Sequence, residues 1–282
     1  MNKLLKNPPI GFLEDFQLPT GKKAYFASDF HLGAPTLAKS AEREKALVRW
    51  LDQISADAGI IFLVGDIFDF WYEYAWAVPK GGVRLLGKLA ALSDAGVPLV
   101  LFTGNHDMWM FGYLSYELKA PVFHQPITIE INGQKIYIGH GDGLGPGDKT
   151  YKLLKKWVFQ NPLAVWLFKQ MHPDWGIGLA TAWSQHSRLT NEKVDDKKFL
   201  GNDEWLWAYS QQVEQTQHHD FYIFGHRHLP LDLKVGHSSR YINLGEWINF
   251  RTYAVLEGQD LHLKAFENET WQHVEVPEAA RV

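Results

Sequence analysis

The chain has no cysteine among its 282 residues. This absence excludes disulfide bonds, thiolate metal ligands and a cysteine nucleophile, so metal chemistry would have to use histidine, carboxylate or amide side chains. Long apolar runs are also missing: no segment reaches the roughly 18 apolar residues of a membrane-spanning helix, and the amino-terminal segment lacks the apolar core of a signal peptide. We therefore expect a cytoplasmic protein.

Positive charge is not in excess either, since the formal net charge is -4 at pH 7. A nucleic-acid binder generally needs surplus lysine and arginine against the phosphates, so we expect no nucleic-acid partner. Hydrophobic residues make up 46% of the chain and charged residues 21%, which predicts one folded domain over residues 1–282. The aromatic content, 14% with 12 tryptophans, indicates either aromatic-rich packing or a surface for apolar or sugar-like ligands.

Polar motifs directly follow three apolar segments that are expected to form strands. Amphipathic helices are expected between these strands, over 38–54 and 85–93. In layered α/β folds the loops at the carboxyl ends of strands carry ligands, so the three motifs should meet at one edge of a sheet. The segments and their motifs are 22–27 with Asp29 and His31, 60–64 with Gly65-Asp66, and 99–103 with Gly104-Asn105-His106-Asp107.

Two further motifs follow strands in the second half of the chain. Residues 127–139 predict a β-hairpin, because Asn132-Gly133 supplies the positive φ angles of a two-residue turn. The hairpin leads into His140-Gly141-Asp142, and the strand expected over 221–224 leads into Gly225-His226-Arg227-His228. The remaining elements expected here are a helix over 204–217 and antiparallel strands up to residue 266.

These motifs concentrate side chains that bind metal ions. Asp29 and His31 are two residues apart, so on an extended strand end both side chains would project to the same side. The Asp66 carboxylate has two oxygens and could bridge two cations. Taken singly, each motif could be structural: Asp66 could cap a helix, and residues 104–107 could form a polar turn. The repetition of such motifs at strand ends favours one shared metal site.

In this order the motifs resemble the pattern of the calcineurin-like metallophosphoesterase superfamily: Asp-x-His, Gly-Asp-x-x-Asp, Gly-Asn-His-Asp, Gly-His and Gly-His-x-His. The resemblance spans residues 29–228 and implies an α/β fold, a two-sheet β-sandwich flanked by helices. It also implies two divalent metal ions bridged by Asp66. The first would be bound by Asp29, His31 and His228, and the second by Asn105, His140 and His226.

Imidazole, carboxylate and amide ligands suit manganese, iron or zinc better than calcium or magnesium, and we favour manganese. Two such ions can lower the pKa of a shared water and orient it toward phosphorus. In the resembling family the position of His106 lies over the phosphate and acts in catalysis, with Asp107 expected to orient its ring; the alternative is a hydrogen-bonding residue behind the ligands. Asp69 and Asp142 are expected to support the ligands.

From residue 148 to about residue 200 the sequence changes to lysine- and tryptophan-rich helical segments, broken at Asn161-Pro162 and His172-Pro173. We expect an inserted helical cap over 148–200. Apolar helices flanked by lysines suit a lipid at an anionic surface, although a helical hairpin packed on the domain would give the same pattern. The residues expected to contact substrate are Asn105, His106, Trp157, Trp166, Trp183, Arg188, Asn191 and Lys193.

Within the superfamily the chain looks like the UDP-2,3-diacylglucosamine diphosphatases of lipid A synthesis, on the segment 65–71, the helical insertion and the length. The resemblance implies water attack on the uridylyl α-phosphorus, which gives UMP and 2,3-diacylglucosamine 1-phosphate. It also implies a peripheral enzyme on the cytoplasmic face of the inner membrane. Its partner would be a nucleotide-linked lipid, and no obligate protein partner is expected.

One position departs from that subfamily, whose members usually carry Gly-Asn-Arg-Asp where this chain has His106. Arginine and histidine contact phosphate differently, so another nucleotide-linked or lipid phosphate stays open as the substrate. A metal-free protein-docking module on the same fold is the alternative of a different class. Because every ligand position of the pattern is filled, we expect an enzyme, a metallophosphoesterase hydrolase.

Overall fold

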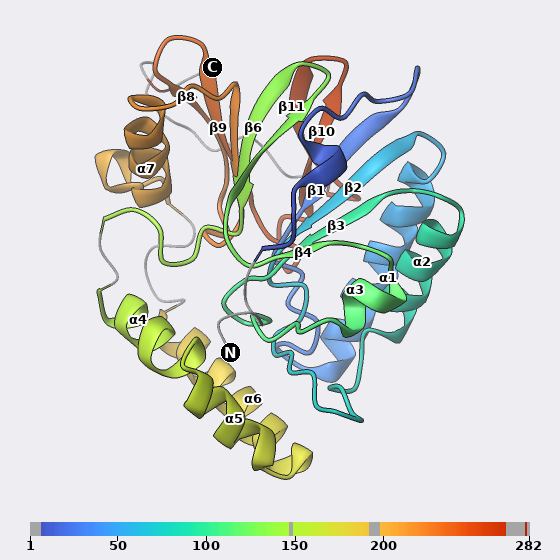
Figure 1. The fold of residues 1–282 in the computed structure, drawn as a ribbon, viewed down its shortest axis with the longest axis vertical. Helices are drawn as coiled ribbons and strands as arrows, with labels where there is room; N and C mark the ends of the chain where they lie inside the picture. The colour runs from blue at the N-terminus through green and yellow to red at the C-terminus, as the bar shows by residue number, and fades with distance from the viewer. Residues whose placement is uncertain (1–6, 147–148, 192–197, 269–279, 281–282) are drawn as a thin grey trace.

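Two β-sheets lie face to face in the computed structural model, which describes residues 7–146, 149–191, 198–268 and 280, with backbone only for 149–150 and 183–191 (Figure 1). The first sheet has the order β11-β10-β1-β2-β3-β4, formed by β1 (Lys23–Ala27), β2 (Ala58–Val64), β3 (Leu99–Phe102), β4 (Val122–Phe123), β10 (Thr252–Glu257) and β11 (Asp260–Ala265). The second has the order β5-β6-β7-β9-β8, formed by β5 (Ile127–Ile131), β6 (Gln134–Gly139), β7 (Phe221–Phe224), β8 (Pro230–Val235) and β9 (Ser239–Leu244).

Helices cover the outer faces of both sheets (Figure 1). The helices beside the first sheet are α1 (Leu37–Ile54), α2 (Val83–Asp94) and α3 (Tyr113–Glu117), and α7 (Trp205–Glu214) lies beside the second. Two short 3-10 turns, η1 (Gly11–Leu13) and η3 (Gly201–Asp203), complete this part of the chain. The predicted fold class, a two-sheet sandwich flanked by helices, is therefore confirmed.

Alternation along the strands explains the layers. On β1, Ala24 and Phe26 are buried in the core between the two sheets, whereas Tyr25 and Ala27 belong to the core under α1 and α2. Successive side chains of a strand point to opposite faces, so a strand covered on both sides is apolar throughout. All seven residues of β2 are buried for this reason.

Strand direction places the ends of the key strands together. β1, β2, β3 and β4 are parallel neighbours, and β6, β7 and β9 are parallel neighbours in the second sheet. The predicted hairpin of β5 and β6 is confirmed. The expectation of antiparallel strands up to residue 266 holds within the pairs β8·β9 and β10·β11, but β9 lies parallel to β7 because β8 passes to the edge of the sheet.

The lysine- and tryptophan-rich segment forms helices that extend from one end of the sandwich (Figure 1). Its helices are α4 (Lys149–Leu154), the π-helical turn η2 (Lys155–Phe159), α5 (Pro162–Gln170) and α6 (Pro173–Asn191). Both predicted breaks are confirmed, and the Asn161 side chain caps α5 by accepting the Leu163 N–H at 2.9 Å. Tyr72, Trp109 and Val165 share a small apolar cluster that joins these helices to the loops after β2 and β3. Within the described ranges no helix has the length and apolar character needed to cross a membrane.

Candidate metal centre

Five loops meet at one end of the sandwich. They follow β1, β2, β3, β6 and β7, and backbone hydrogen bonds join neighbouring loops of the same sheet. Asp29 N–H donates to the Gly65 carbonyl at 3.0 Å, and Gly225 N–H donates to the His140 carbonyl at 3.0 Å. The convergence predicted for the first three motifs is confirmed, and the two later motifs lie with them.

The first group of side chains at this end is Asp29, His31, Asp66 and His228, whose ligand atoms all lie within 4.8 Å of one another. Nε2 of His228 lies 3.2 Å from Oδ1 of Asp29 and 3.1 Å from Nε2 of His31. Asp29, His31 and Asp66 are buried, and His228 is partly exposed. The group contains all three side chains expected at the first metal.

A second group is formed by Asp66, His140 and His226, again with ligand atoms within 4.8 Å of one another. Nε2 of His140 lies 3.3 Å from Oδ2 of Asp66 and 3.3 Å from Oδ1 of Asn105. Asp66 belongs to both groups, which is where a carboxylate must lie if it is to contact two cations. The structure therefore brings together all seven side chains that the sequence singled out as metal ligands.

Backbone conformation, rather than an extended strand, aims several of these side chains. Asp29 and His31 have φ angles of 55° and 45°, and Asp66, His226 and His228 have φ angles of 52°, 65° and 59°. The geometry predicted for Asp29 and His31 is therefore wrong, because β1 ends at Ala27 and both residues lie in a left-handed loop. Such conformations cost about 1–3 kcal/mol each and persist where surrounding structure enforces them, typically at functional sites.

Unpaired buried atoms in the centre fit the binding of cations. Oδ1 of Asp29, Nδ1 of His31 and Oδ2 of Asp66 are buried and make no well-aligned hydrogen bond among the described residues, although Oδ1 of Asp29 and Oδ2 of Asp66 lie close to ring nitrogens of other proposed ligands. A buried polar atom without a partner costs free energy, so three such atoms in one cluster indicate a missing binding partner. Imidazole nitrogens with carboxylate and amide oxygens are ligands for first-row divalent metals. The residues present thus fit divalent cations.

The charges in the centre depend strongly on one another. Burial acts to raise the pKa of Asp66, but the facing histidines, His140 foremost, hold it well below its usual value. Burial acts to lower the pKa of His140, but the Asp66 charge outweighs burial and raises that pKa to about 10. Burial lowers the pKa of His226 to about 4. The Asp66 carboxylate is therefore ionised, as a metal ligand must be.

His106 lies beside the first group. Its backbone N–H donates to Oδ1 of Asp66 at 2.8 Å, and its ring packs edge-on against His31 with 4.9 Å between centroids. Nδ1 lies 3.0 Å from the backbone carbonyl oxygen of Asp69. Because a carbonyl can only accept, Nδ1 carries the hydrogen of that bond, and Nε2 is the nitrogen left for a ligand. Burial lowers the pKa of His106 to about 4.

Asp107 does not orient the His106 ring, so that prediction is wrong. Its carboxylate is fully buried and accepts hydrogen bonds from backbone N–H groups of two loops, so it is already engaged away from the ring. Asp107 therefore fastens the loop after β3 to the loop that carries Asp66. The donors are Gly104 at 2.7 Å, Ile67 at 2.7 Å, Asp66 at 3.2 Å and Phe68 at 3.3 Å.

The two carboxylates that we expected to support the ligands, Asp69 and Asp142, have different surroundings. Oδ1 of Asp69 lies 3.7 Å from Nδ1 of His31 and 3.5 Å from Nδ1 of His106, so Asp69 is placed to orient both rings. Oδ2 of Asp142 instead accepts from Tyr151 Oη at 2.8 Å and Lys155 Nζ at 2.5 Å. Asp142 therefore connects the loop after His140 to α4 and η2.

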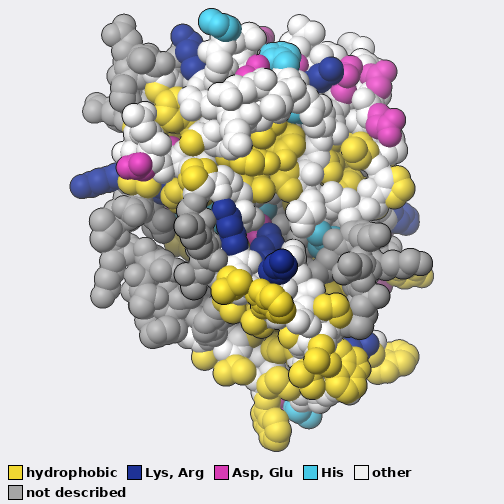
Figure 2. All heavy atoms as spheres, turned by 60° about the vertical axis from the view of Figure 1, so that its left-hand side comes forward, with side chains coloured by type: hydrophobic (Ala, Val, Ile, Leu, Met, Phe, Trp, Pro, Cys, Tyr) yellow, Lys and Arg dark blue, Asp and Glu magenta, His cyan; other side chains and the backbone are white. Residues whose placement is uncertain are grey.

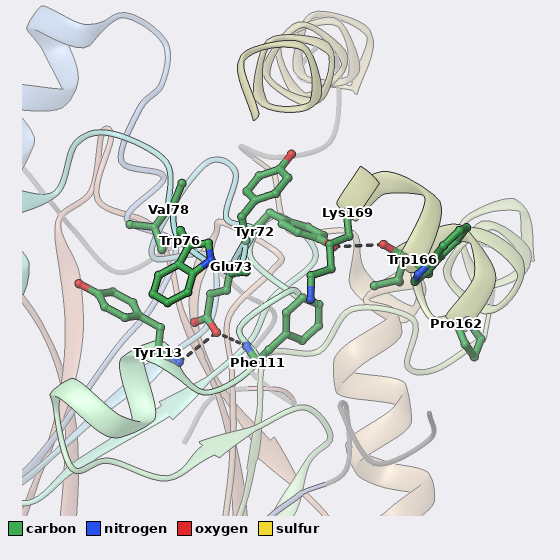
Figure 3. Close-up of a pocket in the computed structure, with 13 residues that line it drawn as sticks. Tyr72, Glu73, Trp76, Val78, Phe111, Tyr113, Pro162, Trp166 and Lys169 are labelled. Carbon is green, nitrogen blue, oxygen red and sulfur yellow. Dashed lines mark hydrogen bonds between the residues drawn. The ribbon is translucent and has the colours of Figure 1, made fainter. Parts of the chain in front are cut away.

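A mostly apolar cavity of about 640 Å³, with Glu73 and Lys169 also in its lining, lies between α5 and the continuation of the metal-binding loops (Figure 3). Tyr72 and Phe111 line it from the loops that carry Asp66 and His106, and Trp166 lines it from α5. Trp157 does not line this cavity and is 61% exposed. The other predicted substrate contacts, the side chains of Trp183, Arg188, Asn191 and Lys193, lie outside the described residues.

Sequence reasoning missed two buried charges that shape the site. The Arg43 guanidinium on α1 donates to the backbone carbonyls of Phe30, His31 and Ala34, at 2.6, 2.7 and 2.5 Å. The Glu73 carboxylate accepts the N–H groups of Phe111 and Tyr113, at 2.6 and 3.0 Å. Neither residue belongs to a motif, and a charge in an amphipathic helix or a loop is ordinarily solvated.

Several known proteins are similar to this chain in sequence. A UDP-2,3-diacylglucosamine hydrolase of Porphyromonas gingivalis is 40% identical over 268 residues, which cover 87% of this chain and 98% of that protein. A UDP-2,3-diacylglucosamine hydrolase of Serratia proteamaculans is 29% identical, covering 79% and 90%. Among solved structures, a mutant cold-active protein tyrosine phosphatase is 16% identical to this chain, and the match covers 95% of this chain and 89% of that one. The TM-score is 0.42, so this likeness supports nothing about function. Residues 22–230 match the family model for calcineurin-like phosphoesterases, and the chain belongs to that family.

Proposed function

We propose that the protein hydrolyses UDP-2,3-diacylglucosamine to UMP and 2,3-diacylglucosamine 1-phosphate with the help of two divalent cations. The observation that carries this proposal is the pair of ligand groups that share Asp66, on loops that continue into the wall of an apolar cavity. The relative from Porphyromonas gingivalis, 40% identical to this chain, has this lipid in its name. A metal-free docking module would not need a complete set of ligand side chains.

For the cations we propose manganese, with iron and zinc as alternatives, because the ligands combine imidazole with carboxylate and amide oxygen. When bound, two divalent cations supply the positive charge that activates a water molecule and stabilises the phosphate oxygens as they gain charge. The chain holds the ligands for them. Asp29, His31 and His228 would hold one cation, Asn105, His140 and His226 the other, and Asp66 both.

His106 is the residue that we place against the phosphate. Its Nδ1–H is engaged by the Asp69 carbonyl, so Nε2 can donate to a phosphate oxygen only when the ring is doubly protonated. Oδ1 of Asp69, 3.5 Å from Nδ1, and the phosphate itself would both favour that form. The ring can then stabilise charge on the phosphate or give a proton to the leaving oxygen.

The cavity under the proposed cap, residues 148–200, is suited to an acyl chain. Its volume of about 640 Å³ is in the range of ligand pockets. In Figure 3 the aromatic side chains of Trp76, Phe111 and Tyr113 surround one part of it, and Trp166 lies on the α5 side. Transfer of an acyl chain from water into this cavity would stabilise the complex by about 0.8 kcal/mol for each methylene group buried.

The outer surface of the same helices is suited to a membrane, and we propose peripheral association with the cytoplasmic face of the inner membrane. Figure 2 shows hydrophobic side chains gathered over the lower part of the molecule, with basic side chains beside them. Trp157, Leu163 and Trp175 are 61%, 63% and 75% exposed. Exposed aromatic and aliphatic side chains next to lysines are typical of helices that lie at an anionic lipid surface.

The proposed function is tested by measuring UMP release with Mn²⁺ from UDP-2,3-diacylglucosamine and from UDP-N-acetylglucosamine, which has no long acyl chains. We expect release that stops when EDTA is added and returns with Mn²⁺. We also expect a preference of about hundredfold or more for the acylated substrate, since burial of a few methylene groups suffices for that. Equal rates would contradict the lipid substrate, and turnover that survives chelation would contradict the use of metal.

A further inference from the structure

Arg227 separates two of the proposed ligands, His226 and His228, and its side chain is buried in an ion pair with Glu204. Nε of Arg227 donates to Oε2 of Glu204 and Nη2 donates to Oε1, both at 3.0 Å. Both residues are 1% exposed. The pair is therefore a fork with two parallel hydrogen bonds, which fixes direction as well as distance.

The partners of Arg227 belong to the segment that returns from the cap. Nη2 also donates to the Lys198 carbonyl at 2.6 Å, and Oε1 of Glu204 accepts the Leu200 N–H at 3.0 Å. Glu204 immediately precedes α7, and the guanidinium lies 5.6 Å from the ring of Trp205. One buried side chain thus joins the loop with two proposed ligands to the last residues of the insertion.

The two neighbouring histidines have conformations that need such support. Both have positive φ angles, 65° for His226 and 59° for His228, which are sparsely populated by residues other than glycine. On the metal side, the His226 N–H donates to Oδ2 of Asp29 at 3.1 Å. The Arg227 fork holds the residue between the histidines, so the short segment is fixed both at His226 and at Arg227.

The beginning of the cap is connected in a similar way. Asp142 follows the proposed ligand His140 by two residues and accepts hydrogen bonds from Tyr151 and Lys155. Both ends of the cap are therefore joined to the metal centre by side chains that lie within two residues of a proposed ligand.

We propose that Arg227 is a positioning residue, whose pairing with Glu204 holds His226 and His228 in the conformations in which they face the cations. The same pair fixes the end of the cap relative to the metal centre. The identity of the bound cations rests on the proposed function, but the positions of Arg227 and Glu204 do not. Residues that orient metal ligands typically affect metal affinity by about 10–100-fold when replaced.

The test uses the double variant R227M/E204M, because replacing both members of a buried ion pair by apolar side chains of similar size leaves no unpaired charge. The control is D232M/R240M, whose Arg240 and Asp232 side chains are less buried, at 23% and 15% exposed. Arg240 and Asp232 also form two side-chain hydrogen bonds, one of them from Nε to Oδ1 at 3.2 Å. Arg240 lies opposite Phe221 in the register of β9 and β7, at the start of β7 and away from the ligand loops.

Isothermal titration of metal-stripped protein with Mn²⁺ is the measurement. We expect R227M/E204M to bind Mn²⁺ about tenfold or more weakly than wild type. The control should keep wild-type affinity for Mn²⁺. The melting temperature of metal-free R227M/E204M should be no lower than that of the metal-free control. Wild-type Mn²⁺ affinity in R227M/E204M would overturn the proposal.

If the double variant does not fold, Mn²⁺ binding by Arg227→Lys tests the proposal instead. Lysine keeps the positive charge but cannot form the two parallel hydrogen bonds to Glu204. Weaker Mn²⁺ binding in this variant supports the positioning role, and unchanged affinity overturns it. A wild-type protein that binds Mn²⁺ without hydrolysing UDP-2,3-diacylglucosamine would refute the proposed function while the affinity comparison still stood.

Discussion

His106 donates its backbone N–H to Oδ1 of Asp66 at 2.8 Å. This bond joins the residue that we place against the phosphate to the carboxylate that we place between two cations. The other oxygen of the same carboxylate, Oδ2, lies 3.3 Å from Nε2 of His140. One side chain thus connects both groups of ligands, and its loss should disturb both together.

Replacing Asp66 with asparagine should lower kcat/KM by about 10³-fold or more, because the cations supply several kcal/mol of charge stabilisation. Calorimetry should also show fewer than two bound Mn²⁺ per chain. Asp94→Asn is the control, since Asp94 is an exposed residue on α2 that pairs with Lys119 at 3.4 Å. Similar activities of the two variants would show that Asp66 is not a shared ligand.

His106→Gln should lower kcat by about 10²–10⁴-fold, the range expected for loss of a general acid or a contact with the developing charge. Mn²⁺ affinity should stay unchanged, because His106 lies outside both groups that share Asp66. Steady-state kinetics and metal titration on the same preparation separate the two effects. A loss of bound metal would instead identify His106 as a ligand, in the cluster that it forms with His31 and Asp69.

Ala77→Phe should narrow the cavity that we assign to an acyl chain, because Ala77 lines it. We expect KM for UDP-2,3-diacylglucosamine to rise about tenfold or more, while hydrolysis of a small phosphodiester stays within about twofold, since only the acylated substrate needs this space. Ala91→Phe, an exposed position on α2, is the control. A parallel change in both activities would show that the cavity does not hold the lipid.

His124 should make the stability of the fold depend on pH. Burial lowers its pKa to about 4, whereas histidine in an unfolded chain titrates near about 6.5. Below about 6.5 the unfolded chain therefore binds more protons, so the free energy of unfolding falls as the pH drops toward 4. This single group accounts for roughly 2 kcal/mol at about pH 5.

Urea unfolding of wild type and His124→Gln at pH 7 and pH 5 measures that contribution. The variant should lose roughly 2 kcal/mol less than wild type between the two pH values. His172→Gln is the control, because the His172 side chain is 64% exposed. Equal losses in wild type and His124→Gln would show that His124 is not held neutral by the fold.

The strand ends and their motifs were predictable because apolar runs stop abruptly at glycine and polar residues. The run that forms β2, for example, stops at Gly65-Asp66, and neighbouring parallel strands bring such ends together. The hairpin around Asn132-Gly133 was predictable for a local reason, the positive φ angles of both residues, 52° and 77°.

What could not be predicted depends on contacts between distant parts of the chain. The left-handed conformation of Asp29 is enforced by bonds such as its N–H to the Gly65 carbonyl, which no local pattern records. Asp107 was expected to orient the ring of His106, whereas its carboxylate accepts hydrogen bonds from backbone groups that include those of another loop. The buried role of Arg227 depends on Glu204, 23 residues away, and is invisible in the motif that contains it.

The central claim is that seven side chains hold two cations on either side of Asp66, and the anomalous X-ray scattering of Mn²⁺ in crystals of the protein tests it most directly. Two anomalous peaks are predicted, one bounded by Asp29, His31 and His228 and the other by Asn105, His140 and His226. A single peak that Asp66 does not contact, or no peak at this end of the sandwich, would contradict the account.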